Sequence, residues 1–139
     1  NSFIGSGLFD MNGLANAGQR VALATDTGGG SNFSMLRTMA AAYEIGQLNG
    51  HPLHPAQLLW LATMGSARSL HIDHEIGSLT PGKYADLVVL DLASTPAIAQ
   101  RQRHASDHWS SLFPTIMMGD DRAIHSVWIK GAERNSKTG

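Results

Sequence analysis

A short apolar run that ends in an acid and three glycines constrains the fold of this chain more than any other feature. Residues 20–25 read R-V-A-L-A-T, Asp26 follows directly, and glycines occupy positions 28–30. An apolar run of this length is typical of a strand that is buried in a parallel sheet. The glycines allow a tight turn, after which a helix-like pattern begins. The segment therefore predicts a strand, a turn and a helix, which is the building unit of an α/β fold.

The rest of the chain alternates between helix-like and strand-like patterns. Ser31 or Asn32 is placed to cap a helix that ends near Leu48. Pro55 suits the first turn of a second helix, whose apolar positions recur at helical spacing as far as Leu70. We further expect a short helix at 10–18, a strand at 84–91, a short helix at about 107–113 and a strand at 124–130.

Asp26 is the first candidate site residue because it stands at the carboxyl end of the predicted strand. Catalytic groups of parallel α/β folds are displayed at that end. A carboxylate there can bind a metal ion or accept a proton from a bound water. The alternative is a loop-bracing or helix-capping aspartate, and the residues leave both interpretations open. The glycine turn could instead bind a phosphate group, but this role is less favoured. The sequence has neither the lysine of a phosphate-binding loop nor the glycine spacing of a dinucleotide-binding motif.

Other polar and aromatic residues predict structural roles. Six of the seven histidines form three spaced pairs without a third ligand nearby in sequence, so we expect them to face solvent or brace loops: His51/His54, His71/His74 and His104/His108. The tryptophans lie on different predicted elements and are expected to anchor the core or a subunit interface: Trp60, Trp109 and Trp128. In the turn before the last strand, we expect an aspartate to accept backbone hydrogen bonds and Arg122 to pair locally.

Composition excludes several classes of partner. The chain has 139 residues, a formal net charge of −1 and no cysteine. Without a basic excess, nucleic acid and anionic membranes are not expected as partners. Without cysteine, disulfides, thiolate metal sites and a thiol nucleophile are excluded. No apolar run approaches the roughly 20 residues that span a bilayer, so we expect a soluble, cytoplasmic protein.

The order of the motifs resembles a known family more closely than any one motif does. The strings A-T-x-G-x-A-x-x-L and I-G-x-L-x-P-G-K-x-A-D-L-V-V-L-D are similar to those of the amidohydrolase superfamily. The strings T-D-x-G-G-G-x-x-F-S-M-L and G-D-D-R narrow the resemblance to its guanine deaminase family. It covers residues 1 to about 134 and corresponds to the carboxyl-terminal third of such an enzyme.

The resemblance implies a fold and a reaction. The fold would be the carboxyl-terminal part of a distorted (β/α)8 TIM-like barrel, over residues 1–74, with strands of a small β-sandwich domain and a connecting helix over 75–139. Asp26 would follow the eighth barrel strand, ligate a single zinc ion and take a proton from the water that attacks C2 of guanine. The products would be xanthine and ammonia. The partners implied are a small purine substrate and a second copy of the chain in a homodimer.

The sequence also departs from that family pattern. The family's H-x-H pair, two further histidine ligands and acidic proton shuttle all precede the matching region, and no H-x-H occurs here. Zinc sites need three or four protein ligands, so we expect this chain alone to be inactive and to bind zinc poorly. The apolar start at Asn1 is what we expect inside a longer protein. Two alternatives stay open, namely a deaminase of another purine-like or pyrimidine-like ring and a non-catalytic, oligomerising module.

Overall fold

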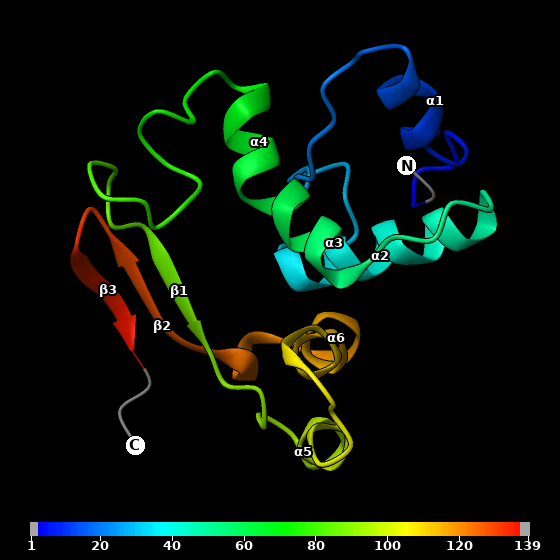
Figure 1. Ribbon diagram of the computed structural model, residues 1–139. Coiled ribbons are helices and arrows are strands. Elements are labelled where there is room, and N and C mark those ends of the chain that lie inside the picture. The colour runs from blue at the N-terminus through cyan, green and yellow to red at the C-terminus, as the bar shows by residue number, and fades with distance from the viewer. Residues whose placement is uncertain (1–2, 137–139) are drawn as a thin grey trace.

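A computed structural model of the protein describes residues 3–136 (Figure 1). Four helices come first along the chain, and a three-stranded sheet with two further helices follows. None of the helices in the described range has the length and hydrophobicity needed to span a bilayer. The elements are α1 (Met11–Asn16), α2 (Met35–Leu48), α3 (Pro55–Ala62), α4 (Met64–Ser69), β1 (Leu87–Leu90), α5 (Pro96–Gln102), α6 (His108–Met118), the 3₁₀ turn η1 (Asp121–Ala123), β2 (Ile124–Ile129) and β3 (Ala132–Ser136).

The strand predicted at 20–25 is not formed. Residues 19–26 run without regular secondary structure, and no strand pairs with them in the part of the chain that the structure describes. Their attachment is to helices: the Leu23 amide donates to the Leu61 carbonyl at 3.3 Å. A parallel strand is defined by its hydrogen bonds to neighbouring strands. The apolar pattern of residues 20–25 therefore does not produce a strand without such a neighbour. We call residues 19–26 the extended segment.

Helix α1 confirms the first predicted helix, and α2 corrects the start of the second. Asp10 caps α1 by accepting a hydrogen bond from the Gly13 amide at 2.8 Å. Helix α2 begins at Met35 rather than beside Ser31 or Asn32. The Asn32 side chain accepts from the Ser34 amide at 2.7 Å, which folds a local turn before the helix and delays its start.

The helix predicted from Pro55 to Leu70 is divided into α3 and α4. Its start is confirmed, since Pro55 occupies the first turn and the His54 ring accepts from the Ala56 amide at 3.2 Å. The break is at Thr63, whose backbone leaves the helical region with φ −128° and ψ −95°. The Thr63 hydroxyl donates to the Leu59 carbonyl at 2.7 Å, a back-bond that commonly bends helices.

Helices α5 and α6 form a pair before the last two strands. The sequence predicts α6 over a shorter range and does not predict α5, which Thr95 caps. Asp107 caps α6 by accepting from two successive amides, those of Trp109 and Ser110, at 2.8 Å each. Gln102 on α5 and Ser111 on α6 exchange two hydrogen bonds of 2.6 Å.

The sheet is antiparallel in the order β1-β2-β3. Strand β1 confirms the predicted strand at 84–91 over a shorter range, and β2 confirms the one at 124–130. Val127 of β2 pairs with Val88 of β1 on one side and with Asn135 of β3 on the other. Strand β3 is not predicted, because its sequence A-E-R-N-S has no alternating apolar pattern.

A buried hydrophobic cluster joins helices from both halves of the chain. It contains Leu36 and Met39 of α2, Leu58 of α3 and Ile116 of α6. In Figure 1, α6 lies beneath α2 and α3, and the sheet stands to one side of the helices. The division at residues 74 and 75 stays a prediction, but α6, which belongs to the second segment, packs on the first.

Candidate active site

Asp26 lies where the extended segment meets the glycine turn. Its φ angle is +53°, in the left-handed region that few non-glycine residues occupy. Aspartate tolerates that region better than most residues, and backbone outliers of this kind cluster at functional sites. The residue is exposed, so its carboxylate is open to a ligand. His71 and Lys130 also have positive φ angles, and both lie in connections.

The glycine turn reverses the chain directly after Asp26. The amides of Gly29 and Gly30 donate to the Asp26 carbonyl at 3.0 and 2.6 Å. Gly28 has φ +100°, where a side chain would strain the backbone. A Cβ at Gly30 would collide with the carbonyl oxygen of Thr25. Two of the three glycines are therefore required by the backbone of the turn alone.

Asp26 borders a small hollow of about 120 Å³ between the turn and the start of α2. Its other polar lining includes Asn32, Arg37 and Thr38. The Arg37 guanidinium also donates to the Met117 carbonyl at the end of α6, at 3.3 Å. The hollow is therefore bounded by one acid, one cation and the amides and hydroxyls of the turn and α2.

Ser66 of α4 fixes the extended segment that carries Asp26. Its hydroxyl lies 2.7 Å from the Leu61 carbonyl and 3.2 Å from the Leu23 carbonyl, and both contacts are hydrogen bonds. Together with the bond from the Leu23 amide to Leu61, they hold the middle of the segment against the junction of α3 and α4. The position of Asp26 thus depends on a helix about 40 residues later in the chain.

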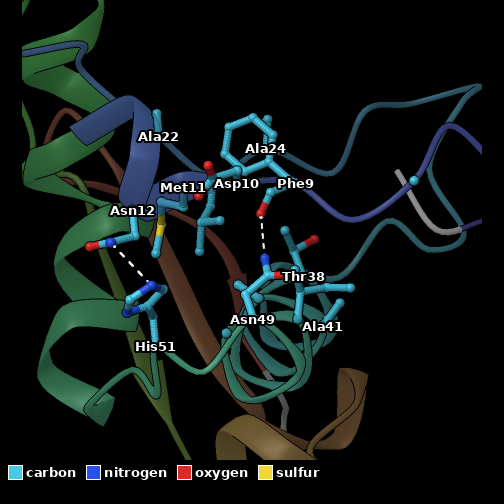
Figure 2. Close-up of a pocket in the computed structure, with 15 residues that line it drawn as sticks. Phe9, Asp10, Met11, Asn12, Ala22, Ala24, Thr38, Ala41, Asn49 and His51 are labelled. Atoms are coloured by element: carbon cyan, nitrogen blue, oxygen red, sulfur yellow. Dashed lines mark hydrogen bonds between the residues drawn. The ribbon is translucent and has the colours of Figure 1, made fainter. Parts of the chain in front are cut away.

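A second hollow of about 250 Å³ lies between α1, the extended segment and α2 (Figure 2). Two hydrogen bonds hold α1 and the residues before it over this space. The side-chain amide (Nδ2) of Asn49 donates to the Phe9 carbonyl at 3.0 Å, and Nδ2 of Asn12 lies 3.2 Å from Nε2 of His51. The space is lined mainly by small and apolar side chains, and the dashed lines in Figure 2 mark these two bonds.

The remaining candidates have structural roles. His54 caps α3, and His71 lies 3.3 Å from the Arg20 guanidinium, as loop-bracing residues do. Within residues 3–136, no three histidine, cysteine or acidic side chains are grouped so that they could hold a metal ion. The predicted local pairing of Arg122 is confirmed, since its Nη2 lies 2.7 Å from Oδ2 of Asp120.

Two of the three tryptophans are less buried than core anchors would be. Trp60 and Trp109 are 44% and 41% exposed, so neither belongs to the core. The interface alternative for them stays a prediction. Trp109 packs edge-on against the His54 ring, with the ring centroids 5.9 Å apart.

The sequence pattern of the amidohydrolase family matches residues 1–133. The chain belongs to this family. It is 38% identical over 138 residues to guanine deaminase of Escherichia coli (strain K12), covering 97% of this chain and 31% of that protein. It is 39% identical over 134 residues to the probable guanine deaminase of Deinococcus radiodurans, covering 94% of this chain and 30% of that protein. This amidohydrolase chain therefore spans about a third of the length of the curated relatives it matches.

Solved structures give the same likeness. The E. coli guanine deaminase structure superposes with a TM-score of 0.95 at 36% identity, covering 99% of this chain and 32% of that one. An adenosine deaminase from Xanthomonas campestris, solved with bound zinc, gives a TM-score of 0.69 at 26% identity over 88% of this chain and 27% of that one. The predicted fold class, part of a distorted TIM-like barrel with strands of a small sandwich, is confirmed by these superpositions.

Three groups of residues around Asp26 are not predicted from the sequence. Arg37 and Thr38 line the hollow from α2, and a helical period counted back from Ala41 would have found them, since 37, 38 and 41 share one face. Ser66 gave no signal, because a small polar residue in a helix has many uses. The sequence alone does not distinguish Gly29 from the other two glycines of the turn.

Proposed function

We propose that this chain is the part of a guanine deaminase that carries the aspartate of the active centre. The observation that carries the proposal is the likeness to the E. coli enzyme, which extends over 99% of the chain with a TM-score of 0.95. The reaction is hydrolysis of guanine. A water oxygen bonds to C2, the bond from C2 to its amino nitrogen breaks, and the products are xanthine and ammonia.

Asp26 is the residue that we assign to this chemistry. Its carboxylate takes the proton that the attacking water gives up, and the proton is passed toward the departing amine. Three features support the assignment: the residue follows an apolar segment, its backbone is an outlier, and it borders a hollow beside the glycine turn. General base catalysis by a positioned carboxylate contributes about 10² to 10⁴ in rate.

We also propose a single zinc ion with Asp26 among its ligands. The ion would lower the pKa of a bound water toward neutrality. The exposed carboxylate fits one place in such a set, since zinc accepts aspartate oxygen. It does not make a centre by itself, because residues 3–136 hold no grouping of three suitable side chains. The other ligands would come from outside this sequence, so the chain alone is expected to bind zinc weakly and to leave guanine unchanged.

A deaminase acting on another ring is the second candidate. It is favoured by the likeness to the Xanthomonas adenosine deaminase, which extends over 88% of this chain. The lower TM-score of that superposition, 0.69 against 0.95, ranks it behind guanine. A non-catalytic module that self-associates is the third. A homodimer in the cytoplasm is part of the proposal for the intact enzyme.

Turnover measured on the intact polypeptide tests these alternatives. Ammonia release is followed with guanine, adenine, adenosine and cytosine as substrates. We expect guanine to be the preferred substrate by kcat/KM. Preference for another base would replace the first proposal with the second, and no turnover of any base by zinc-loaded protein would favour the module. Zinc titration of this chain alone is the companion measurement, and stoichiometric tight binding would contradict the incomplete site.

A further inference from the structure

The carboxylate of Asp26 is folded back over Gly29. A Cβ placed at Gly29 would lie 2.8 Å from Oδ2 of Asp26, 3.3 Å from Cγ and 3.5 Å from Oδ1. The first distance is shorter than carbon and oxygen atoms tolerate without a bond. The space that a side chain at 29 would fill is therefore the space that the carboxylate occupies.

The three glycines of the turn are not equivalent. Gly28 has a positive φ and open space around it, so an added Cβ would strain the backbone and touch nothing. Gly30 faces the Thr25 carbonyl, which is backbone and cannot give way. Gly29 has a φ that an ordinary residue adopts, and its close neighbour is the end of the Asp26 side chain. Alanine at 29 would thus be tolerated by the backbone and resisted by one carboxylate.

We propose that Gly29 is a positioning residue for Asp26. Because Gly29 lacks a Cβ, the Asp26 carboxylate can lie against the turn. Its orientation toward the hollow is thereby fixed. The Gly29 amide contributes by donating to the Asp26 carbonyl at 3.0 Å, which fixes the distance between the two residues. This inference rests on the proposed function, in which the direction of the Asp26 carboxylate matters for chemistry.

The effect of Gly29→Ala depends on which neighbour moves to make room for the added methyl group. A carboxylate turns about its side-chain bonds far more easily than a hydrogen-bonded turn moves, so the side chain shifts and the fold stays. Misplacement of a catalytic group by about 1 Å can cost about 10²-fold in rate. Gly29→Ala in the intact enzyme should lower kcat about 10- to 100-fold, with little change in KM for guanine and little change in Tm.

Gly28→Ala is the matched control, because it lies in the same turn and adds the same methyl group. It should lower Tm through backbone strain, with a smaller loss of kcat than Gly29→Ala shows. Zinc content, measured per polypeptide, gives a readout besides activity and should fall in Gly29→Ala more than in Gly28→Ala. A crystal structure of Gly29→Ala should show the Asp26 carboxylate displaced and the turn unchanged.

Stability coupling keeps the test decisive if the alanine enzyme folds poorly. In an Asp26→Ala background the colliding carboxylate is gone, so Gly29→Ala should change Tm less there than in the wild type. Wild-type kcat in Gly29→Ala would overturn the positioning role. If Gly29→Ala instead lowers Tm markedly, an equal loss in the Asp26→Ala background would overturn it as well. Asp26→Asn in the same series separates the catalytic role of Asp26 from the positioning role of Gly29. If Asp26→Asn keeps full guanine turnover, the catalytic role of Asp26 is wrong, whatever Gly29→Ala shows.

Discussion

The main-chain amide of Lys130 donates a hydrogen bond of 2.8 Å to Oδ1 of Asp86. Lys130 has φ +52° and follows β2, whereas Asp86 directly precedes β1. The next amide, that of Gly131, donates to the Ala85 carbonyl at 3.0 Å. The Lys130 ammonium lies 4.6 Å from the centroid of the Tyr84 ring. The turn between β2 and β3 is thus fastened to the chain that leads into β1.

Asp86→Ala should lower the free energy of unfolding by about 0.5–1.5 kcal/mol, the usual net contribution of one hydrogen bond. The reason is that the Lys130 amide loses its acceptor while the left-handed backbone remains. Urea titration measures the change. Asp86→Asn is the control, because its side-chain oxygen can still accept. An equal loss in both variants would show that the charge, and not the hydrogen bond, is what matters.

Thr115→Val should raise the free energy of unfolding by about 1 kcal/mol. Thr115 is 0% exposed, and its hydroxyl has no hydrogen-bond partner within the described part of the chain. Valine keeps the shape of the side chain and removes the cost of burying an unpaired hydroxyl. Thr115→Ala is the control and should be destabilising, since it leaves a cavity. A valine variant that is less stable than the wild type in urea would contradict the unpaired hydroxyl.

Asp107 should make the free energy of unfolding decrease as the pH falls into the acid range. The hydrogen bond from the Ser110 amide, helped by the Trp109 amide, holds the pKa of Asp107 below its ordinary value of 3.8. Because the folded pKa is lower than the unfolded one, the stabilisation is present above pH 3.8 and is lost as the pH falls through the folded pKa. Asp107→Asn keeps a capping oxygen and does not titrate. Urea titrations at several pH values should show wild type and Asp107→Asn converging in acid, and a constant difference would contradict this cap.

Ser66→Ala should loosen the extended segment. The change removes the donor to the Leu61 and Leu23 carbonyls, so the Leu23 amide should exchange its hydrogen about five-fold faster, as the loss of about 1 kcal/mol implies. Amide hydrogen exchange of the chain measures this. Ser69→Ala is the control, since the Ser69 hydroxyl donates to the Gly65 carbonyl of its own helix at 2.9 Å. Unchanged exchange at Leu23 would remove Ser66 as the anchor.

The elements that could be predicted from sequence are those whose signal is local. The cap at Asp10, the proline start of α3 and the strand patterns of β1 and β2 all depend on neighbours within a few residues. The strand at 20–25 could not be tested by pattern alone, because its ladder needs partners from elsewhere. Strand β3 is not predicted for a related reason. Its residues are mostly polar, and it is a strand because it pairs with β2.

The sequence allows Asp26 to be selected as a candidate residue, but it does not predict the residues that surround it. Asp26 could be selected because its position after an apolar run is a local feature. The anchoring by Ser66 and the contact of Arg37 with Met117 are long-range and left no trace in the sequence. The different reasons for the three glycines depend on where a single added carbon would lie, which only a structure reveals.

We propose that Asp26 performs proton transfer in a guanine deaminase whose other zinc ligands lie outside this sequence. The most direct test is the rate of guanine hydrolysis by the intact zinc-loaded enzyme, compared with its Asp26→Asn variant at equal zinc content. We expect the wild type to release xanthine and ammonia, and we expect the variant to lose about 10² to 10⁴ in kcat. An Asp26→Asn enzyme that hydrolyses guanine at the wild-type rate would contradict it.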